Sequence, residues 1–161
     1  MSMQMNFDPN AFLDLAIDTP FERRNPLPAG DYPATIREVG VRQWQSKDKY
    51  DDSGNLKSGI AYDVALTLHI PLDVKERLKY TTDELQLKDS IMVDLNAQGG
   101  LDTAPGRNGS MRRYREALDM NKPGTAFRPR EMAGRMVLVR VKHEEYLGNI
   151  QERVDGVAKL P

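Results

Sequence analysis

The segment IAYDVALTLHI, residues 60–70, alternates apolar side chains with small or polar ones without interruption. A period of two residues is that of a β-strand, in which successive side chains point to opposite faces. One face of this strand would carry Ile60, Tyr62, Val64, Leu66, Leu68 and Ile70, and the other Ala61, Asp63, Ala65, Thr67 and His69. We therefore predict a strand whose first face lies in a core, while the second meets solvent or a ligand.

Weaker alternation predicts four more strands. The first begins at DYPATIREVGVRQW, with Tyr32, Ala34 and Ile36 inward and Gly40 as a candidate bulge. The others cover residues 89–96 (Ile91, Val93 and Leu95 inward), 135–143 and 149–157. Two stretches lack a strand pattern: the polar segment 45–59, with Asp-Asp-Ser-Gly as its turn, and the charged segment 71–88. A turn at Gly148-Asn149 would join the last two strands into a hairpin.

One helix is expected between the third and fourth strands. Ser110 is a candidate N-cap, and Met111, Tyr114, Ala117 and Leu118 form an apolar stripe at helical spacing. PREMAG, residues 129–134, is expected to form a single turn. Three strands, a helix and a two-stranded hairpin are typical of a five-stranded, OB-fold-like Greek-key barrel, so we predict a mainly β protein of this class. An unrelated α+β meander is the alternative.

The first 26 residues predict an N-terminal arm that precedes the domain at residues 27–161. FDPNAFLDLA is expected to form a short helix, with Asp8 as its N-cap and Pro9 at its first position. DTPFERRNPLPAG then interrupts regular structure with three prolines. The arm is a candidate for self-association, either across a neighbouring domain or over its own.

Composition excludes several classes of function. The chain has 161 residues, no cysteine and no apolar run near the roughly 20 residues that span a membrane. His69 and His143 lie on different predicted strands, and no HExxH, GxxxxGK[ST], GxGxxG or GxSxG motif is present. The turn PGRNGS is more often flexible than phosphate-binding, and the acidic pairs Asp51-Asp52 and Glu144-Glu145 lie in predicted turns. We therefore predict no enzymatic activity, no metal and no cofactor.

The charge is nearly balanced overall but unevenly distributed. The formal net charge is −1, which argues against a strong polyanion binder. Residues 1–104 hold 11 Lys and Arg against 17 Asp and Glu, whereas residues 105–161 hold 12 against 7. This asymmetry indicates either a basic face or an accident of a short chain.

Aromatic and basic residues occur together in the two loops with which such a barrel binds nucleic acid. Unpaired bases stack on aromatic rings, while basic side chains follow the phosphates. The candidate binding residues are Arg42, Trp44, Lys47, Lys49, Tyr50, Lys57, Arg107, Arg112, Arg113, Lys142 and Tyr146. Structural roles compete with this interpretation: Trp44 as a cover for the barrel end, the helix arginines as a solvated face, and Tyr146 as a hairpin packing residue.

LPAGDYPATIREV resembles the opening of small bacteriophage single-stranded-DNA-binding proteins, whose pattern is Leu-Pro-x-Gly-x-Tyr-x-Ala-x-Ile. GSMRRYREALDMN and MAGRMVLVRVKHEEYLGNIQERVDGVAKL are similar to that family's helix, strand and closing hairpin, so the resemblance covers roughly residues 27–161. It implies an OB-fold and non-enzymatic, largely sequence-independent binding and protection of single-stranded DNA during phage replication or recombination. It also implies a place in the cytoplasm of the infected bacterial host, with phage or host replication and recombination proteins as further partners.

The chain ends VDGVAKLP, without the acidic tail through which many such proteins recruit partners, so we do not expect recruitment by that route. The alternative function is that of a protein-interaction module, in which the barrel binds a host or phage protein. The acidic first 104 residues would suit a partner with a basic surface.

Overall fold

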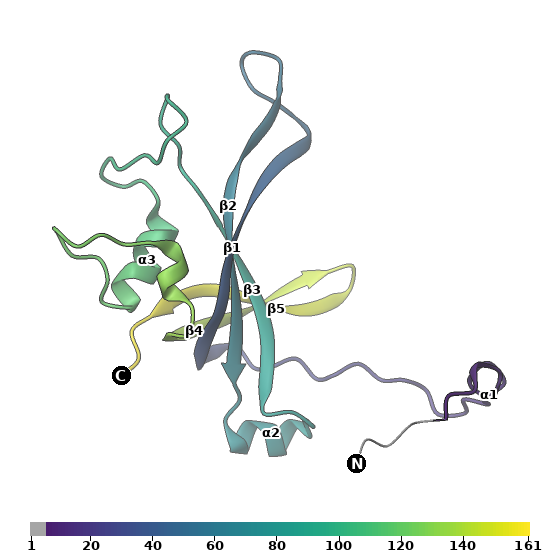
Figure 1. Ribbon diagram of the computed structural model, residues 1–161. Coiled ribbons are helices and arrows are strands. Elements are labelled where there is room, and N and C mark those ends of the chain that lie inside the picture. The colour runs from purple at the N-terminus through teal and green to yellow at the C-terminus, as the bar shows by residue number, and fades with distance from the viewer. Residues whose placement is uncertain (1–5) are drawn as a thin grey trace.

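A computed structural model describes residues 6–161 of the chain, and its architecture is mainly β (Figure 1). The strands are β1 (Gly30–Tyr50), β2 (Leu56–His69), β3 (Glu84–Met92), β4 (Met136–Tyr146) and β5 (Asn149–Ala158). The helices are α1 (Pro9–Leu13), α2 (Leu72–Leu78) and α3 (Gly109–Ala117), with a 3-10 turn, η1 (Pro129–Met132). The predicted mainly β class is confirmed, and so is the turn expected in PREMAG.

The five strands form one antiparallel sheet in the order β3-β2-β1-β4-β5. After the three consecutive strands β1, β2 and β3, strand β4 returns to lie beside β1. This is the Greek-key arrangement. Within the described residues the sheet is not closed, because no hydrogen-bonded ladder joins β3 to β5. Instead, α3 packs against both of these edge strands.

The core lies between the inner face of the sheet and α3. The inward residues predicted for the first strand, Tyr32, Ala34 and Ile36, are all buried. In β2, Val64, Leu66 and Leu68 are fully buried, as predicted, and β4 contributes Val137, Val139 and Val141. The apolar stripe of α3 is also confirmed, since Tyr114 and Ala117 are buried and Met111 and Leu118 pack against the core.

The third strand begins earlier than predicted. β3 starts at Glu84 and pairs with β2 from Leu85↔Leu68 to Ile91↔Tyr62. The prediction missed residues 84–88 because Asp89 occupies an inward position, opposite Val64, and interrupts the apolar alternation. Leu95, predicted to point inward, lies beyond the strand and is 38% exposed.

The predicted loop 45–59 is mostly strand. β1 continues to Tyr50 and β2 begins at Leu56, so the two form a long hairpin that projects beyond the core (Figure 1). Only residues 51–55 turn, stabilised by hydrogen bonds from the Ser53 and Asn55 amides to the Asp51 carboxylate. Backbone pairing extends past the apolar core here, which side-chain patterns do not reveal.

Three local predictions were wrong. The pairing of β1 with β2 is irregular between Ile36 and Glu38 and again between Gln45 and Tyr50, whereas Gly40 pairs regularly with Asp63. The hairpin turn is Leu147-Gly148, both with positive φ, because Tyr146 pairs with Asn149. Ser110 does not cap α3, which follows Asn108 in the left-handed conformation.

The arm holds the predicted short helix. α1 begins at Pro9, and the Asp8 carboxylate accepts a hydrogen bond from the Asn10 amide at 3.0 Å. The first five residues of the expected arm lie outside the described residues. None of the helices described at residues 6–161 has the length and apolarity that crossing a membrane requires.

The arm joins the body through a tight anchor. Arg24 makes a two-point ion pair with the half-buried Glu152 of β5, at 2.7 and 3.1 Å, and donates to the Tyr80 hydroxyl. The Leu27 amide also donates to Glu152, and His143 bonds the Leu27 carbonyl. Residues 6–23, which precede this anchor, make no hydrogen bond or ion pair to the described body, and they extend away from it (Figure 1).

Candidate functional site

The outer face of β1, β2 and β3 carries polar side chains and the ring of Trp44. Three residues of this face that were predicted to meet solvent or a ligand are instead buried: Ala61, Ala65 and Thr67. Residues directly paired across an antiparallel ladder share a face of the sheet. The register therefore groups Gly40 with Asp63, Arg42 with Ala61, and Trp44 with Gly59, all opposite the side that Val64 buries. β3 adds Gln86, Lys88 and Ser90 to the same face.

Two cations share one carboxylate at the centre of this face. The Asp63 oxygens accept hydrogen bonds from Arg42 Nε at 3.0 and 3.2 Å and from the Ser90 hydroxyl at 2.8 Å, and Lys88 Nζ lies 3.6 Å away. Burial by itself raises the pKa of Asp63, but the bonds from Ser90 and Arg42 outweigh it and lower that pKa. Asp63 is therefore charged at neutral pH, holds Arg42 along the sheet, and leaves one positive charge of the group unbalanced.

Further along the same face lies a shallow groove of about 450 Å³. Gly40, Ala65 and Asp63 lie in its lining, and a Cβ on Gly40 would meet nothing within 4 Å. Arg37 lines it too and donates to Gln86 Oε1 at 2.6 Å, an oxygen that also accepts from Thr67. Arg37 thus adds a cation whose hydrogen-bond partner is neutral, and the exposed Glu38 adds an acidic group to the same groove.

Trp44 lies across its hairpin rather than over an end of the sheet. Its indole covers Gly59, its cross-strand partner, so closely that a Cβ there would lie 2.8 Å from indole atoms. The side chain is half-buried. Packing on Gly59 holds the Trp44 ring on the same face as Arg42, and part of the ring remains exposed to solvent.

Four more predicted residues occupy the projecting end of the β1–β2 hairpin. Lys47, Lys49, Tyr50 and Lys57 are all exposed, and Tyr50 is 62% exposed. None of the three lysines forms an ion pair within the described residues. The end of the hairpin therefore presents three lysines and an aromatic ring without a structural role in the core, together with the exposed Asp48, Asp51 and Asp52.

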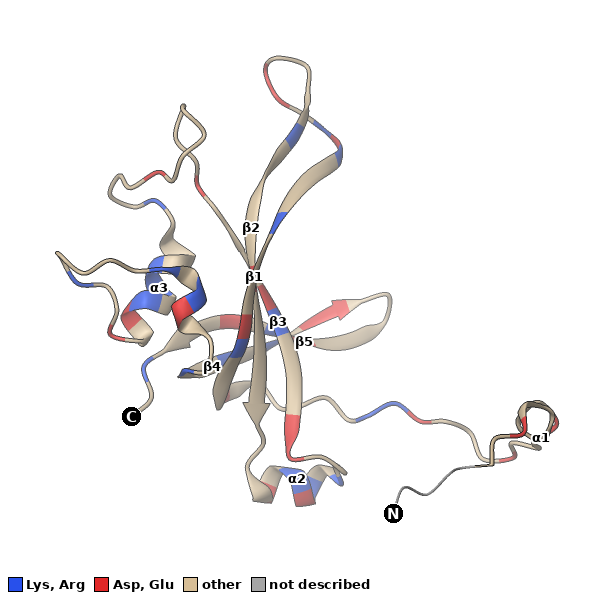
Figure 2. Ribbon diagram, viewed as in Figure 1, with Lys and Arg blue, Asp and Glu red and all other residues tan. Residues whose placement is uncertain are grey.

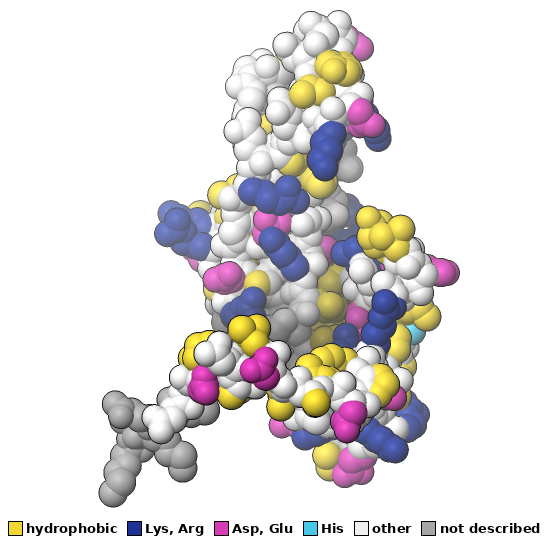
Figure 3. Space-filling model, turned by 90° about the vertical axis from the view of Figure 1, so that its right-hand side faces the viewer, with side chains coloured by type: hydrophobic (Ala, Val, Ile, Leu, Met, Phe, Trp, Pro, Cys, Tyr) yellow, Lys and Arg dark blue, Asp and Glu magenta, His cyan; other side chains and the backbone are white. Residues whose placement is uncertain are grey.

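Lys142 and Tyr146 belong to the β4–β5 hairpin. Both are exposed, although Lys142 lies 3.6 Å from Asp155. Figure 1 shows this hairpin projecting from the body at a large angle to the β1–β2 hairpin. Figure 3 shows the molecule from the side toward which the β4–β5 hairpin projects. On this side, Lys and Arg side chains are spread over the surface below the β1–β2 hairpin, with a few acidic side chains among them.

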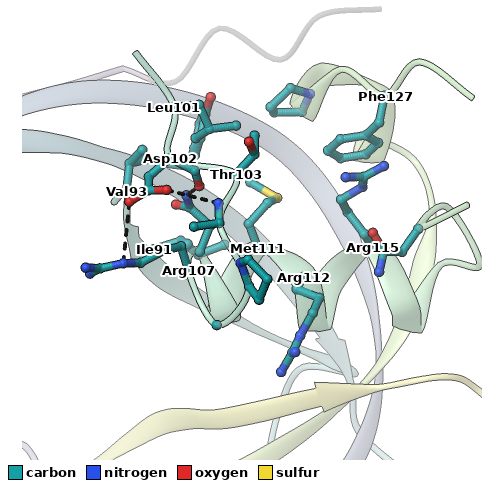
Figure 4. A pocket seen from close by; sticks show the side chains of 17 residues that line it. Ile91, Val93, Leu101, Asp102, Thr103, Arg107, Met111, Arg112, Arg115 and Phe127 are labelled. Carbon is teal, nitrogen blue, oxygen red and sulfur yellow. Dashed lines mark hydrogen bonds and ion pairs between the residues drawn. The ribbon is translucent and has the colours of Figure 1, made fainter. Parts of the chain in front are cut away.

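The structure does not bring Arg107, Arg112 and Arg113 together with Trp44. Arg107 and Arg112 line a separate pocket (Figure 4). Tyr62 and Ile91, which also line it, pair with each other and lie on the inner side of the sheet. Arg107 pairs with Asp102 at 3.4 Å and Arg112 with Glu116 at 3.7 Å. Arg113 lies at the α3–β5 contact.

Sequence reasoning missed Arg37, Gln86 and Lys88. The last two lie in the stretch taken as irregular, yet Gln86, Lys88 and Ser90 alternate with Leu85 and Leu87, a signal that could have placed them on the outer face. Among residues 6–161, no group of three His, Asp or Glu side chains is arranged to hold a metal ion.

No protein-family profile matches the chain, and no curated protein matches it significantly in sequence.

Proposed function

We propose that this protein binds single-stranded DNA without catalysing a reaction. The observation that carries the proposal is the outer face of β1–β3, where the half-buried ring of Trp44 lies in line with the Arg42, Lys88 and Arg37 cations. Bases stack on an aromatic ring whatever their identity, and cations follow the backbone, so we expect little sequence preference.

The order of the elements supports this proposal. An OB-fold binds nucleic acid on its second and third strands and between the loops that join strands 1 and 2 and strands 4 and 5. We propose that this sheet is an OB-type barrel, open between β3 and β5. The outer face, the β1–β2 hairpin and the β4–β5 hairpin would then form one interface, with Tyr50 and Tyr146 as further stacking residues.

The resemblance of LPAGDYPATIREV and of the C-terminal third to phage proteins suggests a setting. We propose protection of single strands during phage replication or recombination, inside the infected bacterium. The near-neutral net charge predicts modest affinity that falls with added salt.

Titration with a fluorescently labelled 30-nucleotide oligo-dT at low salt tests the proposal. We expect binding, quenching of Trp44 fluorescence, and similar affinity for a mixed-sequence strand. Trp44→Ala should weaken binding roughly 5- to 150-fold, since a stacked base is worth about 1–3 kcal/mol. Absence of binding at low salt, judged by both anisotropy and gel mobility, would refute the proposal.

Charge variants distinguish DNA binding by this face from nonspecific attraction to basic residues elsewhere on the protein. Arg37→Gln combined with Lys88→Gln should lower the slope of log affinity against log salt by about 1.4, since each phosphate contact on a single strand contributes about 0.7. Arg77→Gln with Lys79→Gln removes the same charge from α2, outside the proposed interface, and should leave that slope unchanged.

A further inference from the structure

The N-terminal arm is apolar, acidic and uncovered. Within residues 6–23 its large apolar side chains are between 59% and 89% exposed: Phe7, Phe12, Leu13, Leu15, Ile17 and Phe21. The same segment holds Asp8, Asp14, Asp18 and Glu22 against the single Arg23. A soluble chain seldom leaves so many neighbouring apolar side chains in water unless they meet a partner.

Two of these side chains are already arranged as a unit. The Asp8 cap and the turn of α1 place the Phe7 and Phe12 rings 5.8 Å apart, centre to centre, with both rings mostly exposed. Aromatic side chains held in place in this way are typical anchors of protein interfaces, because they lose little conformational freedom on binding.

A pocket of complementary character lies beside α3. Its volume is about 450 Å³, and its apolar lining includes Ile91, Val93, Leu101, Met111 and Phe127 (Figure 4). Arg107, Arg112 and Arg115 also line it, as does one acidic residue, Asp102, which lies 3.4 Å from Arg107. Arg115 stacks over Phe127 at 4.6 Å and bonds the Met120 carbonyl, but has no carboxylate partner among the described residues.

Charge and apolarity therefore match between arm and pocket. Figure 2 shows acidic groups on the arm at α1 and basic groups on α3. We propose that the arm of one copy docks in the α3 pocket of a second copy, with the Phe7–Phe12 pair in the apolar part and the arm's carboxylates near the three arginines. This inference is independent of DNA binding, because the pocket lies on the inner side of the sheet.

A second copy suits the geometry better than the chain's own pocket. The Arg24–Glu152 anchor fixes the point at which the arm leaves the body, and from there the arm runs to the side opposite α3 (Figure 1). Two copies that exchange arms reciprocally would form a closed dimer, the usual outcome of exchanging identical elements.

Mass in solution, measured by light scattering over a concentration series without DNA, tests the proposal. The full chain should approach twice the monomer mass. Phe7→Ser with Phe12→Ser should remain monomeric, and so should Arg107→Glu with Arg112→Glu. Arg77→Glu with Lys79→Glu, on α2, makes the same charge change away from the pocket and should still dimerise.

Mixing identifies the occupant. The arm variant retains its pocket and the pocket variant retains its arm, so their mixture should form a 1:1 complex although neither associates alone. A full chain that is monomeric throughout, or an arm or pocket variant that dimerises unaided, would overturn the proposal. The mixture holds one intact arm and one intact pocket, so a mixture that stays monomeric even at the highest concentration would also overturn the proposal. Binding of a short oligo-dT by the arm variant reports separately on the proposed function.

Discussion

Gly59 sets the position of the only tryptophan in the chain. Because a Cβ there would lie 2.8 Å from the indole, Gly59→Ala must displace the ring of Trp44 from the hairpin. We expect the Trp44 emission maximum to move to longer wavelength as the ring becomes more exposed, with weaker quenching by oligo-dT. Gly40→Ala is the control, since a Cβ at Gly40 meets open space on the same face. An unshifted spectrum in the Gly59 variant would contradict the packing described here.

Asp89 is a half-buried carboxylate at an inward position of β3, where an apolar side chain would be expected. It accepts a hydrogen bond from the Tyr114 hydroxyl at 2.7 Å, which ties α3 to the sheet. Tyr114→Phe removes that donor and should lower the free energy of unfolding by about 1–3 kcal/mol at pH 7, measured in urea. In an Asp89→Asn background the same change should cost less, because no charged acceptor is left without a partner.

The same carboxylate makes stability depend on pH. Burial raises the pKa of Asp89, and the bond from Tyr114 opposes this only in part. The unfolded chain therefore ionises Asp89 first, so its contribution to stability falls as the pH rises from near 3.8 through the raised value. Asp89→Asn should gain stability relative to the natural chain over that range and be similar to it below. A difference independent of pH would exclude this account.

At the scale of elements, the β1–β2 hairpin extends beyond the core and should be separable from it. Replacing residues 46–57 by Asn-Gly joins Gln45 directly to its partner Ser58 through a tight turn. Since no residue in that span is buried, we expect a thermal midpoint within a few degrees of the natural chain's. The loss of Lys47, Lys49 and Lys57 should lower the salt slope of single-strand binding by about 2. An unchanged slope would place the DNA elsewhere.

The elements that the sequence predicted well are those whose side chains alternate against a core. Ile36, Leu66 and Val139 are inward because burial requires it, and their period shows this. The hairpin beyond residue 45 was missed because its register shifts between Gln45 and Tyr50, Tyr50 with Leu56 is its one further pair, and no core sorts its side chains by burial. The start of β3 was missed because Asp89 stands where an apolar residue was expected. The two errors share a cause, because in both segments apolar and polar side chains do not alternate between a buried and an exposed face.

The candidate site was predictable only in part, for a related reason. Trp44 and Arg42 were recognised from residue type, and the structure places them on one face. Lys88 and Arg37 join them through strand register, which a single sequence does not contain. Arg107 and Arg112 were grouped with Trp44 by charge alone, although the sheet lies between them.

At the scale of the whole molecule, the Arg24–Glu152 pair attaches the arm to β5. Burial by itself raises the pKa of Glu152, but hydrogen bonds from Arg24 and the Leu27 amide outweigh it and lower that pKa. Its stabilising effect is therefore present above about pH 4.5 and is lost as the pH falls through the lowered value. Glu152→Gln should cost about 1–3 kcal/mol at pH 7 and little in strong acid, measured by urea unfolding.

An exposed ion pair on the β4–β5 hairpin provides the control for the Glu152 variant. Glu144 lies 3.1 Å from Arg153, and both side chains are at least half exposed, so Glu144→Gln should cost less than about 1 kcal/mol. Equal costs for the two variants would show that the arm's anchor contributes no more than an exposed ion pair.

The open seam between β3 and β5 has a mechanical consequence. The β2–β3 half of the sheet and the β4–β5 half share only β1, which pairs with β4 through residues 30–35 and with β2 from Ala34 onward. A ligand that pulled the two hairpins apart would put β1 under tension near Ile36 and Glu38, where its pairing with β2 is irregular. α3, held to β3 through Tyr114, is the brace across the seam. The stiffness of the molecule under tension thus depends on β1, on α3 and on the unpaired contact between β3 and β5.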